Sequence, residues 1–100
     1  MREDLKKIAL ERAKSAARNL GYNLTSVAET DLKIFIENGI DRMTSSEYLS
    51  TSDNTRLFNN IEVLIRLMES DARSRFMNES LDYKSFSNAR DNICPLWPFC

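Results

Sequence analysis

The sequence contains no histidine. This absence excludes the nucleophilic pairs in which histidine activates a serine or a cysteine, and it removes the most common metal ligand in proteins. Glycine is scarce as well, because Gly21 and Gly39 are the only two in the chain. Two isolated glycines cannot build a phosphate-binding loop or a dinucleotide-binding motif. We therefore expect no enzymatic activity, no catalytic residue and no cofactor.

Cysteine is limited to Cys94 and Cys100. A structural zinc site needs four soft or imidazole ligands, so these two residues predict no metal site within one chain. They could close a small disulfide loop, but the N-terminal residues lack the continuous apolar segment of a secretory signal. We therefore expect a cytoplasmic protein whose thiols are free.

Long apolar runs and an excess of one charge are also missing. Apolar runs such as residues 34–36 and 63–65 span only three residues, far fewer than the roughly 18 that cross a bilayer. The net charge is −1, from 14 basic and 15 acidic residues, which gives no general attraction to nucleic acid or to an acidic membrane. We expect neither a membrane nor a nucleic acid as the partner.

The residues that are present favour helices. Two prolines and two glycines leave few residues for the turns of an all-β protein, and the apolar spacing is helical. We predict an all-α fold in a single domain, residues 1–100, with four main helices, a long central third helix and an extended C-terminal tail. The helices are expected at residues 2–20, 26–39, 53–77 and 83–93, followed by an apolar tail at 94–100.

Several helix ends carry sequence signals. Gly21 suits the left-handed position that follows the first helix, and Asn38–Gly39 is expected to end the second helix. Ser26 and Glu29 have the spacing of a capping box at the start of the second helix. Asp82 is expected to cap the fourth helix.

Apolar residues at helical spacing predict the inner face of each helix. The residues expected in the core are Leu5, Ile8, Ala9, Ala13, Ala16, Leu20, Ala28, Leu32, Phe35, Ile36, Leu57, Phe58, Ile61, Leu64, Ile65, Met68, Ala72, Phe76, Phe86, Ala89 and Ile93. Val63 and Leu67 lie on nearly the opposite side of the third helix. They either pack between two layers of the same domain or bind another chain.

The last eight residues, ICPLWPFC, carry no charge, although chain ends are usually polar. In one interpretation Leu96, Trp97 and Phe99 fold back over the helices, and burial of each contributes roughly 1.5–3 kcal/mol. In the other interpretation the two prolines hold the tail extended, and Trp97 anchors it to a partner.

These features together predict a small non-catalytic protein that acts in protein–protein interaction or regulation and self-associates as a homodimer. The candidate partner-binding residues are Val63, Leu67, Leu96, Trp97 and Phe99.

The alternative is a nucleic-acid-binding regulator with a fold like the helix-turn-helix. Ala17, Leu20, Gly21 and Val27 match the small, apolar and turn positions of that motif in part. The second helix would then be the recognition helix. Two acidic residues on it would face the phosphates, which disfavours this alternative.

Overall fold

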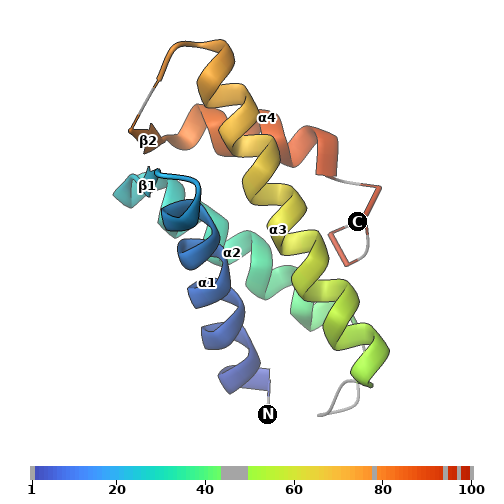
Figure 1. The fold of residues 1–100 in the computed structure, drawn as a ribbon. Helices are drawn as coiled ribbons and strands as arrows, with labels where there is room; N and C mark the ends of the chain where they lie inside the picture. The colour runs from blue at the N-terminus through green and yellow to red at the C-terminus, as the bar shows by residue number, and fades with distance from the viewer. Residues whose placement is uncertain (1, 44–49, 78, 94, 97, 100) are drawn as a thin grey trace.

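The computed structural model describes residues 2–43, 50–77, 79–93, 95–96 and 98–99. The described helices and strands are α1 (Arg2–Asn19), β1 (Asn23–Leu24), α2 (Ser26–Met43), α3 (Thr51–Ser74), β2 (Ser80–Leu81) and α4 (Tyr83–Ile93) (Figure 1). The prediction of an all-α fold with four main helices is confirmed. The third helix is the longest, with 24 residues, and both α2 and α3 pack against α1 and α4.

The turns after α1 and α3 have the same hydrogen-bonding pattern. After α1, Gly21 has a φ of 88°, and the amide of Tyr22 donates to the carbonyl of Ala17 at 2.9 Å. After α3, Phe76 has a φ of 61°, and the amide of Met77 donates to the carbonyl of Ala72 at 2.9 Å. Each turn therefore ends its helix as a Schellman motif.

The stop at Gly21 is confirmed, whereas the predicted end of the third helix is wrong. Helix α3 ends at Ser74, and Phe76 is 89% exposed instead of buried in the core. The apolar stripe could not reveal this outcome, because Phe76 has the spacing of a core residue. It occupies the left-handed position that glycine usually holds.

A short parallel strand pair joins the two turns. Asn23 pairs with Ser80 and Leu24 with Leu81. The amide of Thr25 also donates to the carbonyl of Leu81 at 3.1 Å. Helices α2 and α4 therefore begin side by side and run away from the same two-stranded sheet (Figure 1). The sequence did not predict this sheet, since two residues are too few to show an alternating pattern.

The residue that caps α2 differs from the prediction. The hydroxyl of Thr25 accepts from the amide of Ala28 at 3.2 Å, and Ser26 is the first residue of the helix. The predicted capping box at Ser26 and Glu29 is therefore wrong by one residue at its first position. Asp82 caps α4 as predicted, because its Oδ1 accepts from the amide of Ser85 at 2.9 Å.

Helix α2 continues past Gly39 to Met43, so the predicted end at Asn38–Gly39 is wrong. Gly39 is buried inside the helix. A Cβ atom there would lie 3.3 Å from Cδ1 of Phe99 and 3.5 Å from Cγ of Pro98. Glycine at this position makes room for the C-terminal tail and does not end the helix.

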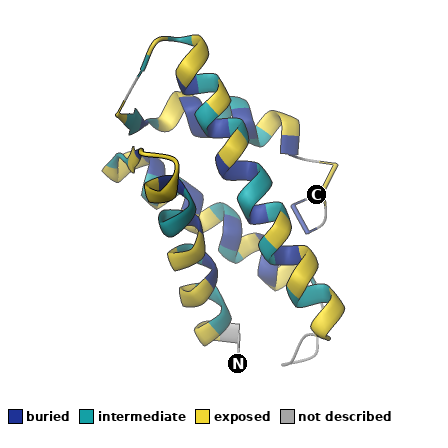
Figure 2. Cartoon of the chain, in the orientation of Figure 1, coloured by how far each residue is buried: buried dark blue, intermediate teal, exposed yellow. Residues whose placement is uncertain are grey.

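The core contains most of the residues expected from helical spacing (Figure 2). Ile8 of α1 and Leu20, which directly follows α1, are the two further exceptions, because both are exposed. A stripe of alanines, Ala9, Ala13 and Ala17, faces the interior instead. Small side chains let the neighbouring helices approach α1 closely. The described residues of the core cluster are Ala9, Ala13, Ala17, Tyr22, Leu32, Ile36, Ile40, Leu57, Ile61, Leu64, Ile65, Met68, Ala72, Leu81, Phe86, Ala89, Ile93 and Phe99.

Candidate functional site

The C-terminal tail returns to α2 and buries Phe99. This side chain is 2% exposed, and its ring stacks on Phe35 with a centroid distance of 4.9 Å. Its carbonyl accepts from Nη2 of Arg42 at 3.3 Å. Phe99 therefore lies where the fold-back interpretation puts it, whereas Leu96 is at the surface.

Three residues of the tail that entered the sequence predictions lie outside the described residues. They are Cys94, Trp97 and Cys100. The anchoring role of Trp97 and the free state of the thiols stay predictions.

Val63 and Leu67 are partly buried and pack against the core. Asp71 continues their stripe along α3, and its Oδ1 accepts from Nδ2 of Asn88 on α4 at 2.7 Å. The end of α3 that carries Asp71 therefore faces α4. Val63 and Leu67 contact the core of their own chain, and their binding to another chain stays a prediction.

A cluster of charged and polar side chains joins α3 to the start of α4. The guanidinium of Arg75 donates through Nε to Asp71 at 2.9 Å and through Nη2 to Asp82 at 2.9 Å. Nη2 also donates to the buried hydroxyl of Ser85 at 2.8 Å. The hydrogen bond from Arg75 is the main cause that lowers the pKa of Asp82 from 3.8 to about 2. These groups hydrogen-bond one another, so they stabilise the turn after α3.

Within the part of the chain that the structure describes, His, Cys, Asp and Glu side chains form no group of three that could hold a metal ion. None of the described helices combines the length and the apolar character needed to cross a membrane.

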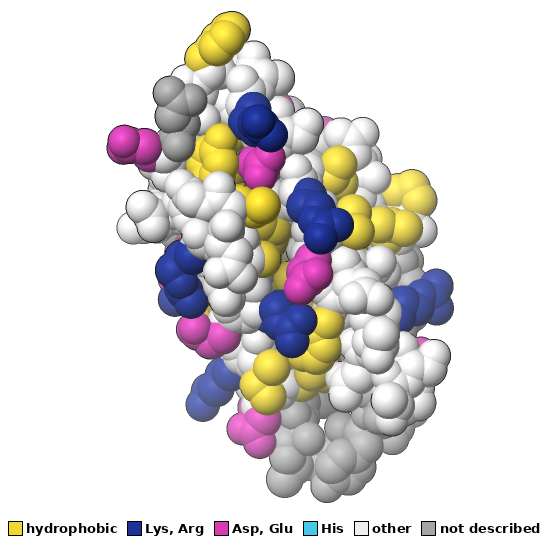
Figure 3. Space-filling view, viewed as in Figure 1, with side chains coloured by type: hydrophobic (Ala, Val, Ile, Leu, Met, Phe, Trp, Pro, Cys, Tyr) yellow, Lys and Arg dark blue, Asp and Glu magenta, His cyan; other side chains and the backbone are white. Residues whose placement is uncertain are grey.

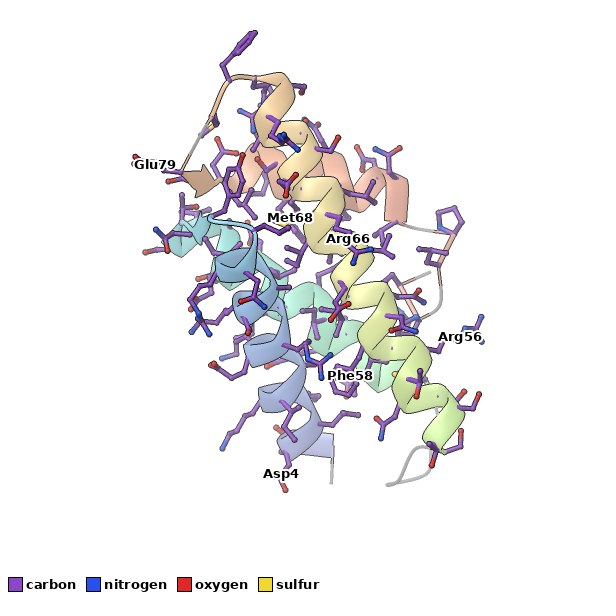
Figure 4. The ribbon with its side chains drawn as sticks, in the orientation of Figure 1. Asp4, Arg56, Phe58, Arg66, Met68 and Glu79 are labelled. Carbon is purple, nitrogen blue, oxygen red and sulfur yellow. The ribbon has the colours of Figure 1, made fainter. Side chains whose placement is uncertain are left out.

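The face formed by α1 and α3 is crossed by charged side chains. Nη1 of Arg12 lies 3.3 Å from Oε1 of Glu62, and the guanidinium of Arg12 lies 5.0 Å from the ring centroid of Phe58. Figure 3 shows basic and acidic side chains gathered over this face, and Figure 4 shows Phe58 between the two helices. The Arg12–Glu62 ion pair bridges the two helices. A groove of about 160 Å³ also lies on this face, and it is lined by Ala16, Asn19, Leu20, Glu62 and Arg66.

A groove between α2 and α4 has a different character. It has a volume of about 240 Å³ and is lined by Asp31, Ile34, Phe35, Asn38, Tyr83, Phe86 and Arg90. The rings of Phe35 and Phe86 meet edge to face with a centroid distance of 5.6 Å. Ile34 is 52% exposed and Tyr83 is 45% exposed, so large apolar side chains border the groove on both sides.

We define the α2/α4 face as this groove together with Val27, which is 60% exposed. Val27, Asp31, Ile34 and Asn38 follow one stripe along α2, because they are three or four residues apart. Val27 lies near the start of α2 and Tyr83 at the start of α4. Three of the exposed large hydrophobic residues thus gather on one face.

Two opposite charges lie in the groove. Asp31 comes from α2 and Arg90 from α4. The guanidinium of Arg90 lies 5.5 Å from the ring centroid of Phe86. Asp31 has no side-chain hydrogen bond or ion pair with any other described residue. One side of the groove therefore offers a carboxylate and the other a guanidinium.

Sequence reasoning missed Val27, Ile34 and Tyr83 as candidate site residues. A signal was present for the first two, because they are seven residues apart on the side of α2 opposite to Leu32 and Ile36. No such signal marks Tyr83, which joins them only because the strand pair sets the starts of α2 and α4 side by side.

The positions that matched a helix-turn-helix motif do not pack as that motif requires. Leu20 and Val27 would be buried between the two helices of such a motif, but both are exposed. Glu29 lies near Lys14 of α1, with an Nζ–Oε1 distance of 3.6 Å. The arrangement of α1 and α2 therefore does not favour nucleic-acid recognition.

The described residues form a small all-α fold with four helices, and exposed apolar side chains border the groove between α2 and α4. No protein-family model matches the chain, and no curated protein or solved structure matches it.

Proposed function

We propose that this chain is a non-catalytic protein–protein interaction module that binds its partner through the α2/α4 face. The observation that carries the proposal is the exposure of Ile34 and Tyr83 on the two sides of one groove, with Val27 exposed on the same stripe of α2. Exposed apolar side chains that cluster on one face, with polar groups among them, are typical of protein-binding surfaces.

The same face has the chemical variety that a specific interface needs. Removal of apolar side chains from water by a partner lowers the free energy of the complex, and tyrosine is a preferred residue at the centre of interfaces. Asp31, Asn38 and Arg90 add polar groups that favour a partner of matching charge. The lack of histidine and of glycine-rich motifs supports a binding role over a catalytic one.

The proposal differs from the sequence prediction in the residues that bind. Val63, Leu67 and Phe99 pack against the core of their own chain, so they support the fold of the module. The interaction role itself is retained, and the α2/α4 face takes the place of the predicted patch on the third helix.

A pair of matched substitutions tests the role of this face. Ile34 is 52% exposed on α2 and Ile8 is 56% exposed on α1, so Ile34→Asp and Ile8→Asp place the same charge at similarly exposed positions. The tagged protein and both variants would be used to capture binding proteins from cells that express the chain.

We expect Ile34→Asp to lose the captured proteins and Ile8→Asp to retain them. Tyr83→Asp should behave like Ile34→Asp, because it places a charge on the other side of the groove. Far-ultraviolet circular dichroism would check that all three variants fold. Equal capture by the variants and the unchanged protein would refute the α2/α4 face as the binding site.

A further inference from the structure

The groove has opposite charges on its two sides, at similar distances from the strand pair. Asp31 is the sixth residue of α2, and Arg90 is the eighth residue of α4. The two helices begin side by side at the parallel strands. A second copy of the chain, generated by a rotation of 180° about an axis along the groove, would therefore place its Arg90 opposite Asp31 of the first copy and its Asp31 opposite Arg90 of the first copy.

We propose that the partner bound at the α2/α4 face is a second copy of this chain, related by such a two-fold axis. This inference rests on the proposed function and names the occupant of the same site. In a two-fold dimer every contact occurs twice. Asp31 of each protomer then faces Arg90 of the other protomer, and both charge pairs are attractive.

The apolar residues follow the same exchange. Val27 and Tyr83 are the second residue of α2 and the first residue of α4, so they also lie at matching distances from the strand pair. The axis places Val27 of one protomer opposite Tyr83 of the other. Ile34 of each protomer packs against the α4 side of the groove in the other protomer. Apolar contacts thus occur twice beside the charge pairs, as a self-complementary surface requires.

Charge exchange provides a test that no other occupant reproduces. Asp31→Arg gives each protomer two arginines at the contact, and Arg90→Asp gives each protomer two aspartates. Each variant alone should dimerise roughly tenfold more weakly than the unchanged chain, because two attractive pairs become repulsive. An equimolar mixture of the two variants restores both attractive pairs and should form a heterodimer.

Sedimentation equilibrium at several protein concentrations would measure the dimer dissociation constants. Native mass spectrometry would identify the heterodimer, because the two variants differ in mass. The double variant Asp31→Arg/Arg90→Asp should dimerise about as well as the unchanged chain. Ile8→Asp serves as the control, because Ile8 lies on α1 outside this face.

Circular dichroism would verify the fold of each variant. Arg90→Asp removes a cation that lies over Phe86, so the single variant Asp31→Arg provides a second test that leaves this contact intact. It should weaken the dimer and keep the helical signal.

Two results would overturn the proposed homodimer. One is a strictly monomeric chain up to several hundred micromolar. The other is a dimer whose dissociation constant is the same for both single variants and whose mixture gives no heterodimer above the statistical amount. If Ile34→Asp still abolished capture of a different protein, the proposed function would stand and only the identity of the partner would be wrong.

Discussion

Replacement of Gly39 by alanine tests whether the tail lies directly on α2. In a helix interior this change stabilises the folded protein by about 1 kcal/mol, because glycine loses more backbone entropy on folding. At this position the new Cβ would lie 3.3 Å from Cδ1 of Phe99 and 3.5 Å from Cγ of Pro98. The ring must therefore shift away from α2 by a few tenths of an ångström.

The ring has little room for this shift. Phe99 is 2% exposed and stacks on Phe35 with an interplanar angle of 14°. Its carbonyl is held by Arg42. Strain of this kind costs about 1 kcal/mol or more in a packed core. We therefore expect Gly39→Ala to leave the free energy of unfolding unchanged or slightly lower.

A double-mutant cycle separates the two contributions. Phe99→Ala alone should lower the free energy of unfolding by about 3 kcal/mol, the lower end for a buried phenylalanine because a chain end can relax. In the Phe99→Ala background, Gly39→Ala should then raise it by about 1 kcal/mol. The expected coupling between the two sites is therefore about 1 kcal/mol or more.

Urea unfolding followed by far-ultraviolet circular dichroism would measure each free energy. Ser70→Ala, at an exposed position of α3, controls for helix propensity and should be additive with Phe99→Ala. If Gly39→Ala stabilised the protein equally with and without the Phe99 ring, the tail would not lie on Gly39 and the reasoning would fail.

Three further predictions follow from other parts of the fold. Asp82 has a pKa of about 2 in the folded chain and 3.8 as its ordinary value. Its charged form therefore adds about 1–2 kcal/mol to the free energy of unfolding after allowance for solvent screening, and this contribution is present above pH 4 and lost as the pH falls toward 2. In urea unfolding from pH 5 to pH 2, the free energy of unfolding of Asp82→Asn should depend less on pH than that of the unchanged chain. Phe76→Gly should raise the free energy of unfolding by about 0.5–1 kcal/mol, because a positive φ is unfavourable for phenylalanine and the side chain is 89% exposed. Gly21→Ala should lower the free energy of unfolding for the same reason. Thermal melts in which the two substitutions shifted the midpoint in the same direction would contradict this prediction. Leu64→Ala should cost about 2–5 kcal/mol, since Leu64 is fully buried, and a smaller loss on chemical denaturation would show that the α3 stripe is not the centre of the core.

The helices could be predicted because their signals are local. Gly21 ends α1, and the Asp82 carboxylate accepts from the amide of Ser85, so each residue acts within one turn of its own helix. Gly39 misled the prediction because its role depends on Phe99, which is distant in sequence. Phe76 misled it because helical spacing cannot show that a helix ends two residues earlier.

The candidate site was harder to predict for a related reason. Ile34 could be noticed as an apolar residue on the polar side of α2, but no pattern in the sequence predicts that it lies near Tyr83. Their proximity depends on the pairing of β1 with β2, and two-residue strands leave no periodic pattern. Residues from separate helices form a site only through tertiary structure, which local patterns do not encode.

The strand pair has a consequence for the independence of the two halves of the chain. The amides of Asn23 and Thr25 donate to carbonyls of Glu79 and Leu81, so each helical hairpin uses hydrogen-bonding groups from the other hairpin to complete its turn. Neither hairpin can satisfy these groups within its own sequence. We therefore expect the α1–α2 hairpin and the α3–α4 hairpin to act as complementing fragments. Produced as separate polypeptides, each would have an incomplete turn and an uncovered core, and mixing them would restore both.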